Sequence, residues 1–316
     1  MLDTNFKHKA VLLKETIDSL ECKENGIYLD CTIGGGGHSS EILQLIGESG
    51  FLYGLDRDKD AVLAANQKLE QIGKNYKIIK SSYVNLSELV NEYNIPKLDG
   101  ILFDLGVSSY QLDNAERGFS FSKNAFLDMR FDQEDNLNLT ASDVVNKFTK
   151  DNLVEIFSKY GEEPYSKTIA LAIVEYRKTK KIETTTELSE LILNALSHKK
   201  FKGSVHPATR IFQALRIEVN NELEGLKNAL YQAIDQLKVG GKLSVISFHS
   251  LEDRIVKEIF KDSTKSCICP PRQPICTCNK IAVGKLVNKK PIIAIEQEIK
   301  ENPRARSAKL RVLEKI

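Results

Sequence analysis

The chain has 316 residues, enough for one large domain or two modest ones. A composition of 41% hydrophobic and 28% charged residues indicates a soluble globular protein and argues against disorder. The formal net charge of +2 at face value disfavours strong nucleic-acid binding. No run approaches 18 apolar residues and the N-terminus lacks the apolar segment of a signal peptide, so we expect a cytoplasmic protein without a membrane span.

The balanced total hides an uneven distribution of charge. Residues 254–316 carry 15 basic and 6 acidic side chains, a net charge of +9, whereas residues 1–112 sum to −5. A basic end of this size is the expected footprint of a contact with a polyanion. A solvated tail that keeps the protein in solution would give the same pattern.

Strand and helix patterns alternate over the first 110 residues. Strands are predicted at residues 26–31, 51–56, 76–80 and 98–104, and helices at 40–46, 60–72 and 87–93. This alternation predicts an α/β fold with a doubly wound, Rossmann-like parallel sheet.

The alternation stops near residue 113. The segment 113–205 turns polar and then helical, with apolar stripes at 153–160 and 188–195. The second stripe follows a Thr184…Glu187 pair that is typical of a capping box. We therefore predict an inserted, all-helical substrate-recognition subdomain over residues 113–205.

The sheet pattern resumes at residue 206. A long helix is predicted from Pro207, with an apolar stripe that continues to Leu230 and an end at Gly240-Gly241. A strand at 242–248, a helix at 251–260 and two strand-like segments, 291–299 and 308–313, follow; the last two would pair antiparallel at the sheet edge. Residues 1–112 and 206–316 are thus predicted to form one discontinuous domain.

A predicted strand that runs into four glycines is the strongest local signal, in residues 28–38 (YLDCTIGGGGH). Glycines let a backbone approach a ligand closely, and the following helix N-terminus favours anionic groups. A tight turn without a ligand is the alternative. The spacing fits neither the G-x-G-x-x-G fingerprint nor a phosphate loop, which favours a nucleotide-like ligand without a pyrophosphate.

Polar or aromatic side chains follow the other predicted strands. Asp56 lies 20 residues after Gly36, where a carboxylate can accept hydrogen bonds from ribose hydroxyls, although a solvated acid at a helix start would look alike. Tyr83 could pack on an adenine or be an ordinary half-buried tyrosine. Asp104 ends the fourth strand beside the switch point of the sheet, where a reacting group would be held; a helix cap is its alternative. Together these features suggest an S-adenosylmethionine site.

Several longer and unusual motifs accompany these positions. They are residues 34–39, 56–58, 104–121 (DLGVSSYQLDNAERGFSF), 128–130, 160–162, 206–223 (HPATRIFQALRIEVNNEL), 247–257 and 302–311. Through them the chain resembles the ribosomal RNA small subunit methyltransferase H family over nearly its whole length. The resemblance implies methyl transfer from S-adenosylmethionine to the exocyclic N4 of a cytidine in 16S ribosomal RNA, at the decoding centre.

The resemblance also implies which residues bind the cofactor. These positions fall on Gly36, Gly37, His38, Asp56, Tyr83, Asp104 and Gln111. The chain differs from common choices of the family at Tyr83, where phenylalanine is frequent, and at Tyr110, where proline is frequent. Neither difference removes a group that binding requires.

The implied partners are the small ribosomal subunit and its 16S rRNA, with no DNA and no membrane; the sequence leaves a homodimer open. RNA contacts are expected from scattered basic residues of the motifs, any of which could instead be a structural ion pair, and from a histidine near the active site. The candidates are Arg117, Arg130, Arg210, Arg216, His249, Arg254, Arg304 and Arg306. His206, in contrast, is expected to be structural. Residues 254–316 should lie on the same side of the sheet as Asp104.

Cytosine N4 is a weak nucleophile because its lone pair is delocalised into the ring. The enzyme must therefore align nitrogen, methyl and sulfur and supply an acceptor for the N–H groups, for which Asp104 or a neighbouring carbonyl is the candidate. The base is expected to leave its stack. A DNA amino-methyltransferase would carry Asp/Asn-Pro-Pro-Tyr/Phe where this chain has Asp104-Leu-Gly-Val, and intact Gly36, Asp56 and Asp104 argue against a non-catalytic assembly factor.

Cysteine is too sparse for a disulfide-rich scaffold, but four of the six cysteines lie within twelve residues. Cys267, Cys269, Cys276 and Cys278 could bind one structural zinc ion. The C-x-C spacing is tighter than the usual C-x₂-C, and a reduced, exposed loop without metal is the alternative.

Overall fold

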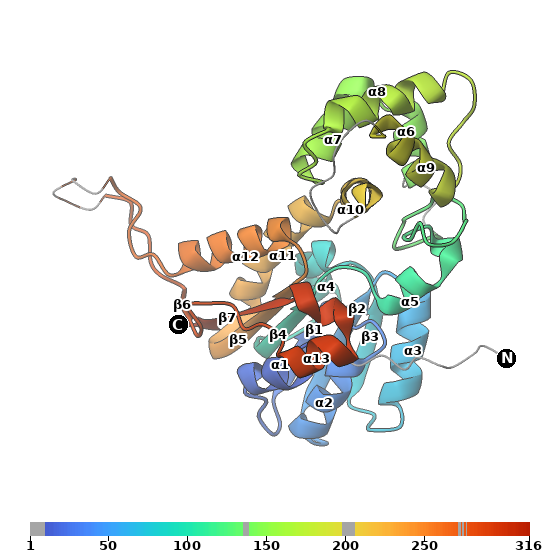
Figure 1. Cartoon of the computed structure of the whole chain (residues 1–316). Helices are drawn as coiled ribbons and strands as arrows, with labels where there is room; N and C mark the ends of the chain where they lie inside the picture. Colours follow the sequence, from blue (N-terminus) through green and yellow to red (C-terminus); the bar gives the residue numbers. More distant parts are fainter. Residues whose placement is uncertain (1–9, 135–138, 198–205, 271–272, 274, 276) are drawn as a thin grey trace. The chain divides into compact units, whose positions relative to one another are not determined.

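The computed structural model describes residues 10–134, 139–197, 206–270, 273, 275 and 277–316 (Figure 1). The chain divides into two compact units. One joins Met1–Gly106 to Leu223–Ile316, and the other is the continuous segment Val107–Glu222. Among the described residues, no helix is long and apolar enough to cross a membrane.

The first unit is built on a seven-stranded sheet with the order β3-β2-β1-β4-β5-β7-β6. The strands are β1 (Ile27–Asp30), β2 (Phe51–Asp56), β3 (Tyr76–Lys80), β4 (Leu98–Asp104), β5 (Leu237–Ser247), β6 (Gly284–Leu286) and β7 (Lys309–Lys315). Strands β1 to β5 are parallel, and β7 is antiparallel to both β5 and β6. The predicted doubly wound, Rossmann-like sheet is confirmed, and its switch point lies between β1 and β4.

Helices cover both faces of this sheet (Figure 1). They are α1 (Leu13–Leu20), α2 (Gly37–Ile46), α3 (Lys59–Leu69), α4 (Leu86–Glu92), α11 (Glu222–Gln236), α12 (Ser250–Ser263) and α13 (Glu296–Glu301), with short turns η1 (Tyr83–Asn85) and η3 (Pro303–Ser307). Because successive strand side chains point to opposite faces, Leu29 and Phe103 pack with α4, α11 and α12, whereas Tyr28 and Leu102 pack with α1, α2 and α3. The two resulting cores fix the strand ends at which ligands bind in such sheets.

The second unit is helical. It contains α5 (Ser109–Asp113), η2 (Ala115–Arg117), α6 (Ala141–Lys147), α7 (Lys150–Lys159), α8 (Ser166–Tyr176), α9 (Thr185–Ala195) and α10 (Pro207–Asn220). The predicted stripes are its core, with Leu153, Phe157, Leu188 and Ile192 fully buried. Within its described part there is one isolated bridge, Phe126 to Thr184, and no strand.

The predicted limits of the insertion were wrong. Helix α10 was assigned to the sheet domain, but its apolar stripe packs into the core of the second unit, with Ile211 and Leu215 fully buried there. The long helix predicted from Pro207 is also two helices, because Asn221 adopts the left-handed conformation (φ 49°, ψ 44°) that ends α10. The insertion therefore spans Val107–Glu222 and not 113–205.

Two predictions for the remaining sheet also need correction. The glycine pair does not end a helix: it lies inside β5, where Gly240 has φ +82° and the register between β4 and β5 shifts. Residues 291–299 are not a strand. Only Ile292 forms a bridge, to Leu310, and α13 follows; the edge strand is the short segment β6, which the sequence pattern did not predict.

Candidate cofactor site

The glycine turn and three aspartates meet at the carboxyl ends of β1, β2 and β4. Asp30 ends β1, Asp56 ends β2 and Asp104 ends β4, and all three strands are parallel neighbours. Since ligands of doubly wound sheets bind beyond these strand ends at the switch point, this edge is the candidate site.

Glycine is required in this turn for different structural reasons at different positions. Gly34 and Gly36 have φ of +51° and +74°, in the left-handed region where a side chain is strained, and Gly36 precedes the first residue of α2. A Cβ on Gly37 would come within 2.9 Å of the Ala10 Cβ, so this position must stay small. The turn therefore leaves its backbone amides near the strand ends without covering them by side chains.

Asp56 connects the second strand to this turn. Its Oδ2 accepts a hydrogen bond from the Gly34 N–H (2.9 Å), and its Oδ1 accepts one from the Asp58 N–H (2.9 Å). Burial raises the pKa of Asp56 to about 6, although both hydrogen bonds act to lower it. Each carboxylate oxygen can accept a second hydrogen bond, so Asp56 can still accept hydrogen bonds from ribose hydroxyls.

Asp30 belongs to the same edge, and the sequence reasoning did not single it out. It is 1% exposed and accepts hydrogen bonds from the Ser39 hydroxyl (2.7 Å) and the Thr32 N–H (3.0 Å). Burial raises its pKa to about 6. Asp30 thus holds the start of α2 against β1, and the only sequence signal was an acid inside an otherwise apolar strand.

Asp104 is the least satisfied acid of the site. Its Oδ1 is buried and has no hydrogen-bond partner among the described residues, and its Oδ2 lies 3.6 Å from the His38 Nδ1. Burial, together with the negative charges of Asp30 and Glu252, raises its pKa well above the usual range. A buried acceptor without a donor is a position where a ligand's cationic or N–H group would be stabilised.

His38 supports Asp104 from within α2. The ring is 4% exposed, and burial lowers its pKa to about 4, so it is neutral near pH 7. Its Nε2 lies 3.1 Å from the Val11 carbonyl and must carry the proton to donate to it. The lone pair of Nδ1 then faces Asp104, which favours a proton on Asp104 while no cation is near.

Tyr83 lies at the start of η1, after β3. Its half-buried ring packs edge-on against Phe103, with centroids 5.5 Å apart, and the Arg57 guanidinium carbon lies 5.8 Å from the ring centroid. Gln111 belongs to the second unit, where it is 5% exposed and its side chain accepts a hydrogen bond from the Ser108 N–H (3.0 Å). The strand edge of the first unit thus includes six of the seven predicted cofactor positions, and Gln111 is the exception.

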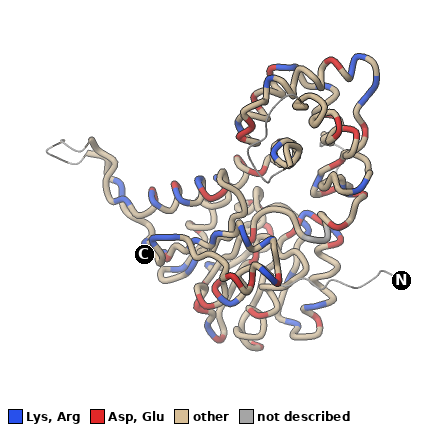
Figure 2. Tube along the Cα trace, in the orientation of Figure 1, with Lys and Arg blue, Asp and Glu red and all other residues tan. Residues whose placement is uncertain are grey.

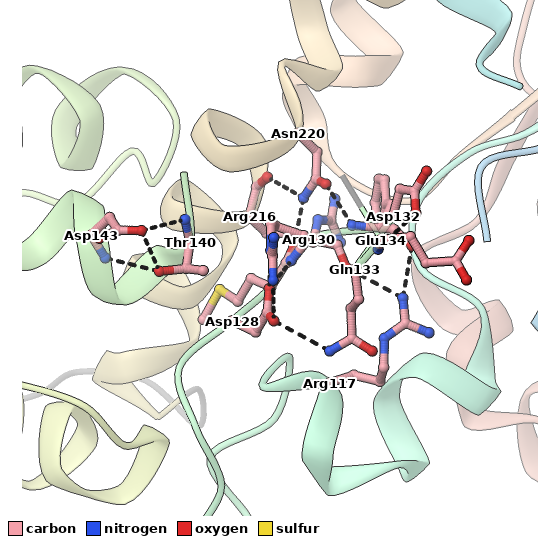
Figure 3. A network of polar contacts seen from close by, with 12 residues as sticks. Arg117, Asp128, Arg130, Asp132, Gln133, Glu134, Thr140, Asp143, Arg216 and Asn220 are labelled. Atoms are coloured by element: carbon pink, nitrogen blue, oxygen red, sulfur yellow. Dashed lines mark hydrogen bonds and ion pairs between the residues drawn. The ribbon is translucent and has the colours of Figure 1, made fainter. Parts of the chain in front are cut away.

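Three of the arginines that were expected to contact RNA have partners inside the second unit. The Arg117 side chain is buried and donates to the carbonyls of Arg130 and Phe131, which favours the structural alternative left open by the sequence. Arg130 forms a two-pronged pair with Asp128, which Figure 3 shows within a larger polar network. Asn220 holds the same loop to α10 by donating to the Met129 carbonyl (2.7 Å).

Arg216 is also paired. Its Nε and Nη2 each lie 2.8 Å from a Glu222 carboxylate oxygen, and the two side chains are 15% and 6% exposed. This geometry favours the structural alternative left open by the sequence.

We expect Arg216→Met to lower the free energy of unfolding by about 3 kcal/mol, because it leaves the Glu222 carboxylate buried without its partner. Urea unfolding would measure the change. Lys178→Met is the control, since Lys178 and its partner Glu175 are 62% and 57% exposed, and it should change stability by less than about 0.5 kcal/mol. Arg210 is 50% exposed but lies 3.8 Å from the carboxylate of Glu163, which is 5% exposed, so it would not serve as the control. Equal effects of the two variants would contradict a structural role for Arg216.

The other RNA candidates differ in exposure. Arg254 and Arg306 are exposed and Arg304 is partly buried. His249 instead caps α12: its Nδ1 accepts from the Glu252 N–H (3.4 Å), and its Nε2 lies 3.1 Å from the Glu252 carboxylate. His206 caps α10 and stacks on Phe121, as expected for a structural residue.

Basic residues of the C-terminal region lie at two places in the first unit. β7 starts beside the end of β5, with Lys309 opposite Ser247, which puts this start at the same sheet edge as Asp104. Other basic residues line a groove between α12, β6 and β7, which we call the basic groove. Figure 2 shows Lys and Arg positions, in blue, along the trace of α12. Its lining residues are Lys257, Phe260, Lys261, Leu286, Asn288, Lys289 and Arg311. The start of β7 agrees with the prediction that residues 254–316 lie on the same side of the sheet as Asp104, and β7 then runs away from that edge, to Glu314 opposite Lys242.

A Rossmann-like sheet, a glycine turn without the dinucleotide fingerprint, and acids ending β2 and β4 define the class of S-adenosylmethionine-dependent methyltransferases. The pattern that defines the MraW methylase family matches residues 5–316, and the chain belongs to this family.

Known relatives agree with this assignment and with the resemblance found in the sequence. Ribosomal RNA small subunit methyltransferase H of Clostridium botulinum (strain Loch Maree / Type A3) is 50% identical over 311 residues, covering 98% of this chain and 99% of the relative. The protein of the same name from Acetivibrio thermocellus is 51% identical over 313 residues, with 98% and 99% coverage. Among solved structures, an rRNA methylase from Streptococcus thermophilus matches with 12% identity, 98% coverage of both chains and a TM-score of 0.44.

Proposed function

We propose that this protein transfers a methyl group from S-adenosylmethionine to the exocyclic N4 of a cytidine in 16S ribosomal RNA of the small subunit, at the decoding centre. The names of its relatives support the ribosomal RNA substrate. The observation that carries the proposal is Asp104, a buried acid with an unpartnered oxygen at the switch point of the sheet.

The donor set at the strand edge fits the cofactor. Asp56 would accept from the ribose hydroxyls, Tyr83 would pack on the adenine, and the turn at Gly36 and Gly37 would admit the rest of the molecule. Asp104 would face its positively charged part. From the resemblance alone, Gln111 of the second unit would join them, and this unit would recognise the RNA.

The bound cofactor supplies a methyl group that is already activated by its sulfonium charge. The N4 nitrogen forms the new C–N bond as the C–S bond breaks, and one proton leaves the amino group. Asp104 is placed to accept a hydrogen bond from that N–H group and so to hold nitrogen and methyl carbon in line. As an anion, Asp104 can take the proton, which then exchanges with solvent.

The cysteines support methylation of nitrogen over carbon. Methyl transfer to a ring carbon of cytosine would need a nucleophile to activate the ring. The cysteine of this edge, Cys31, is 2% exposed, and burial raises its thiol pKa well above the usual range, so it is inert.

Mass spectrometry of nucleosides from purified 16S rRNA tests the proposal. Cells that lack this protein should lose the N4-methylcytidine signal, and the purified protein with labelled cofactor should restore it on isolated small subunits. An unchanged N4-methylcytidine signal would contradict the assignment. A protein that binds small subunits without transferring methyl would instead be an assembly factor.

Cofactor binding is expected to release protons. Asp30 and Asp56 have pKa values raised to about 6 and the pKa of Asp104 is also raised well above its usual range, so part of this cluster is protonated in the free protein near neutral pH. A cationic ligand favours the ionised carboxylates, so the affinity for S-adenosylmethionine should rise about tenfold between about pH 5.5 and 7.5. Calorimetry across this range, with the uncharged-sulfur product S-adenosylhomocysteine as control, measures it. Equal pH dependence for both ligands would rule out a role of the sulfonium charge.

A further inference from the structure

A cysteine-rich arm, residues 264–283, leaves the first unit between α12 and β6. Figure 1 shows its described part extending away from α12. The large apolar side chains of this arm are exposed: Ile268 by 59%, Ile275 by 75% and Ile281 by 78%. The Val283 N–H donates to the Ser263 carbonyl (2.9 Å) and closes the base of the arm. These three side chains add no core to the described part of the arm.

Three thiols converge in this arm. The sulfur atoms of Cys267, Cys269 and Cys278 all lie within 4.8 Å of one another, and those of Cys267 and Cys278 are 3.8 Å apart. A disulfide would require about 2.05 Å. Zn–S bonds of about 2.3 Å in tetrahedral geometry place two ligand sulfurs about 3.8 Å apart. The Cys278 thiol donates to the Cys267 sulfur across this distance, which equals the spacing of two ligands on one zinc ion.

Backbone N–H groups point at each of these sulfurs. The N–H groups of Ile268, Cys269 and Thr277 donate to the sulfurs of Cys278, Cys267 and Cys269, respectively, each at 3.4 Å. Donors aimed at sulfur stabilise the thiolate form. Thiolates are the form that binds metal, whereas a metal-free loop gains little from three such donors.

We propose that Cys267, Cys269 and Cys278 bind one Zn²⁺ ion that serves as a structural staple of the arm. Tetrahedral zinc takes a fourth ligand. Cys276 supplies a fourth thiol in the sequence, but it lies outside the described residues. The zinc ion has no part in methyl transfer and closes a segment whose described isoleucine side chains are exposed.

Elemental analysis of the full-length protein, purified with reductant and without chelator, tests the site. About one zinc per chain is expected, and Cys267→Ser and Cys278→Ser should each lower the content below about one tenth. Cys22→Ser is the matched control, because it makes the same chemical change outside the arm and should keep the metal. Iron in place of zinc, no metal even after zinc is added, or zinc retained by both arm variants would overturn the proposal.

Limited proteolysis gives a second measurement that does not depend on the variants. Removal of zinc by a chelator should speed cleavage within residues 264–283 at least severalfold while circular dichroism stays unchanged, and added zinc should reverse this. An equal cleavage rate with and without zinc would contradict the proposed structural role of the ion. A mass two hydrogens lower under non-reducing conditions, with no zinc, would show that the arm carries a disulfide instead.

Discussion

Replacing Asp104 with asparagine is expected to lower methyl transfer to small ribosomal subunits about 10²- to 10⁴-fold. Asparagine keeps the shape of the side chain but presents an N–H donor and cannot become an anion. The Oδ1 of Asp104 has no hydrogen-bond partner among the described residues. The asparagine oxygen can still accept a hydrogen bond, but the variant loses the negative charge that stabilises a cation and the carboxylate that can take the proton of the amino group. Single-turnover transfer of labelled methyl to isolated small subunits would measure the loss.

Without cofactor, Asp104→Asn should be at least as stable as the unchanged protein. The folded-state pKa of Asp104 is raised, so the folded protein binds this proton more tightly than the unfolded chain does. Stability from this group is therefore lost as pH rises, and Asp104→Asn should unfold at an equal temperature near pH 4 and at a higher temperature near pH 8. Asp60→Asn, an exposed acid at the start of α3, is the control and should change neither transfer nor stability. A full rate for Asp104→Asn with normal cofactor affinity would exclude the proposed role.

Strands β2, β3 and β4 could be predicted to the residue, and the reason is local. Each is a short apolar run between turn signals, and each is followed by a helix that starts close behind it. The break at Asn221 could not be predicted this way. The apolar stripe continues in phase across it, from Leu215 in α10 to Leu226 in α11, while only the backbone conformation of one residue changes.

The site was predictable to the extent that it depends on strand ends. Asp56 and Asp104 could be found because the carboxyl ends of parallel strands meet at one edge. The neutral His38 beside Asp104 could not, since its protonation depends on the Val11 carbonyl and on burial.

The roles of the arginines could not be predicted from the motifs either. The sequence could not separate a phosphate contact from a structural pair, because the partners of Arg117 are backbone carbonyls that the fold brings to it. The basic groove could not be predicted either, since three elements far apart in the chain contribute to it.

Replacing Lys257 and Lys261 together with glutamine is expected to weaken binding of ribosomal RNA about tenfold at low salt. Both side chains are exposed on α12 and line the basic groove beside Lys289, whereas Arg311 of the same groove is paired with Asp253 at 2.7 Å. Two lysines that contact phosphates release about two counterions. The slope of log affinity against log salt should therefore become less negative by about 0.7 to 0.9 per lost contact.

The matched control removes the same charge elsewhere in the first unit. Lys14 and Lys74 are 81% and 75% exposed, and each pairs with an acid four residues away in the sequence. If the basic groove binds RNA phosphates, the Lys14 and Lys74 double variant should keep the salt slope, because only contacts release counterions and net charge alone does not. Cofactor affinity should stay unchanged in both double variants, since neither pair lies at the carboxyl ends of β1, β2 and β4. If both double variants lost RNA affinity equally, the affinity would depend on the total charge of the protein. The +9 charge of residues 254–316 would then serve to keep the protein in solution and would not form a binding surface.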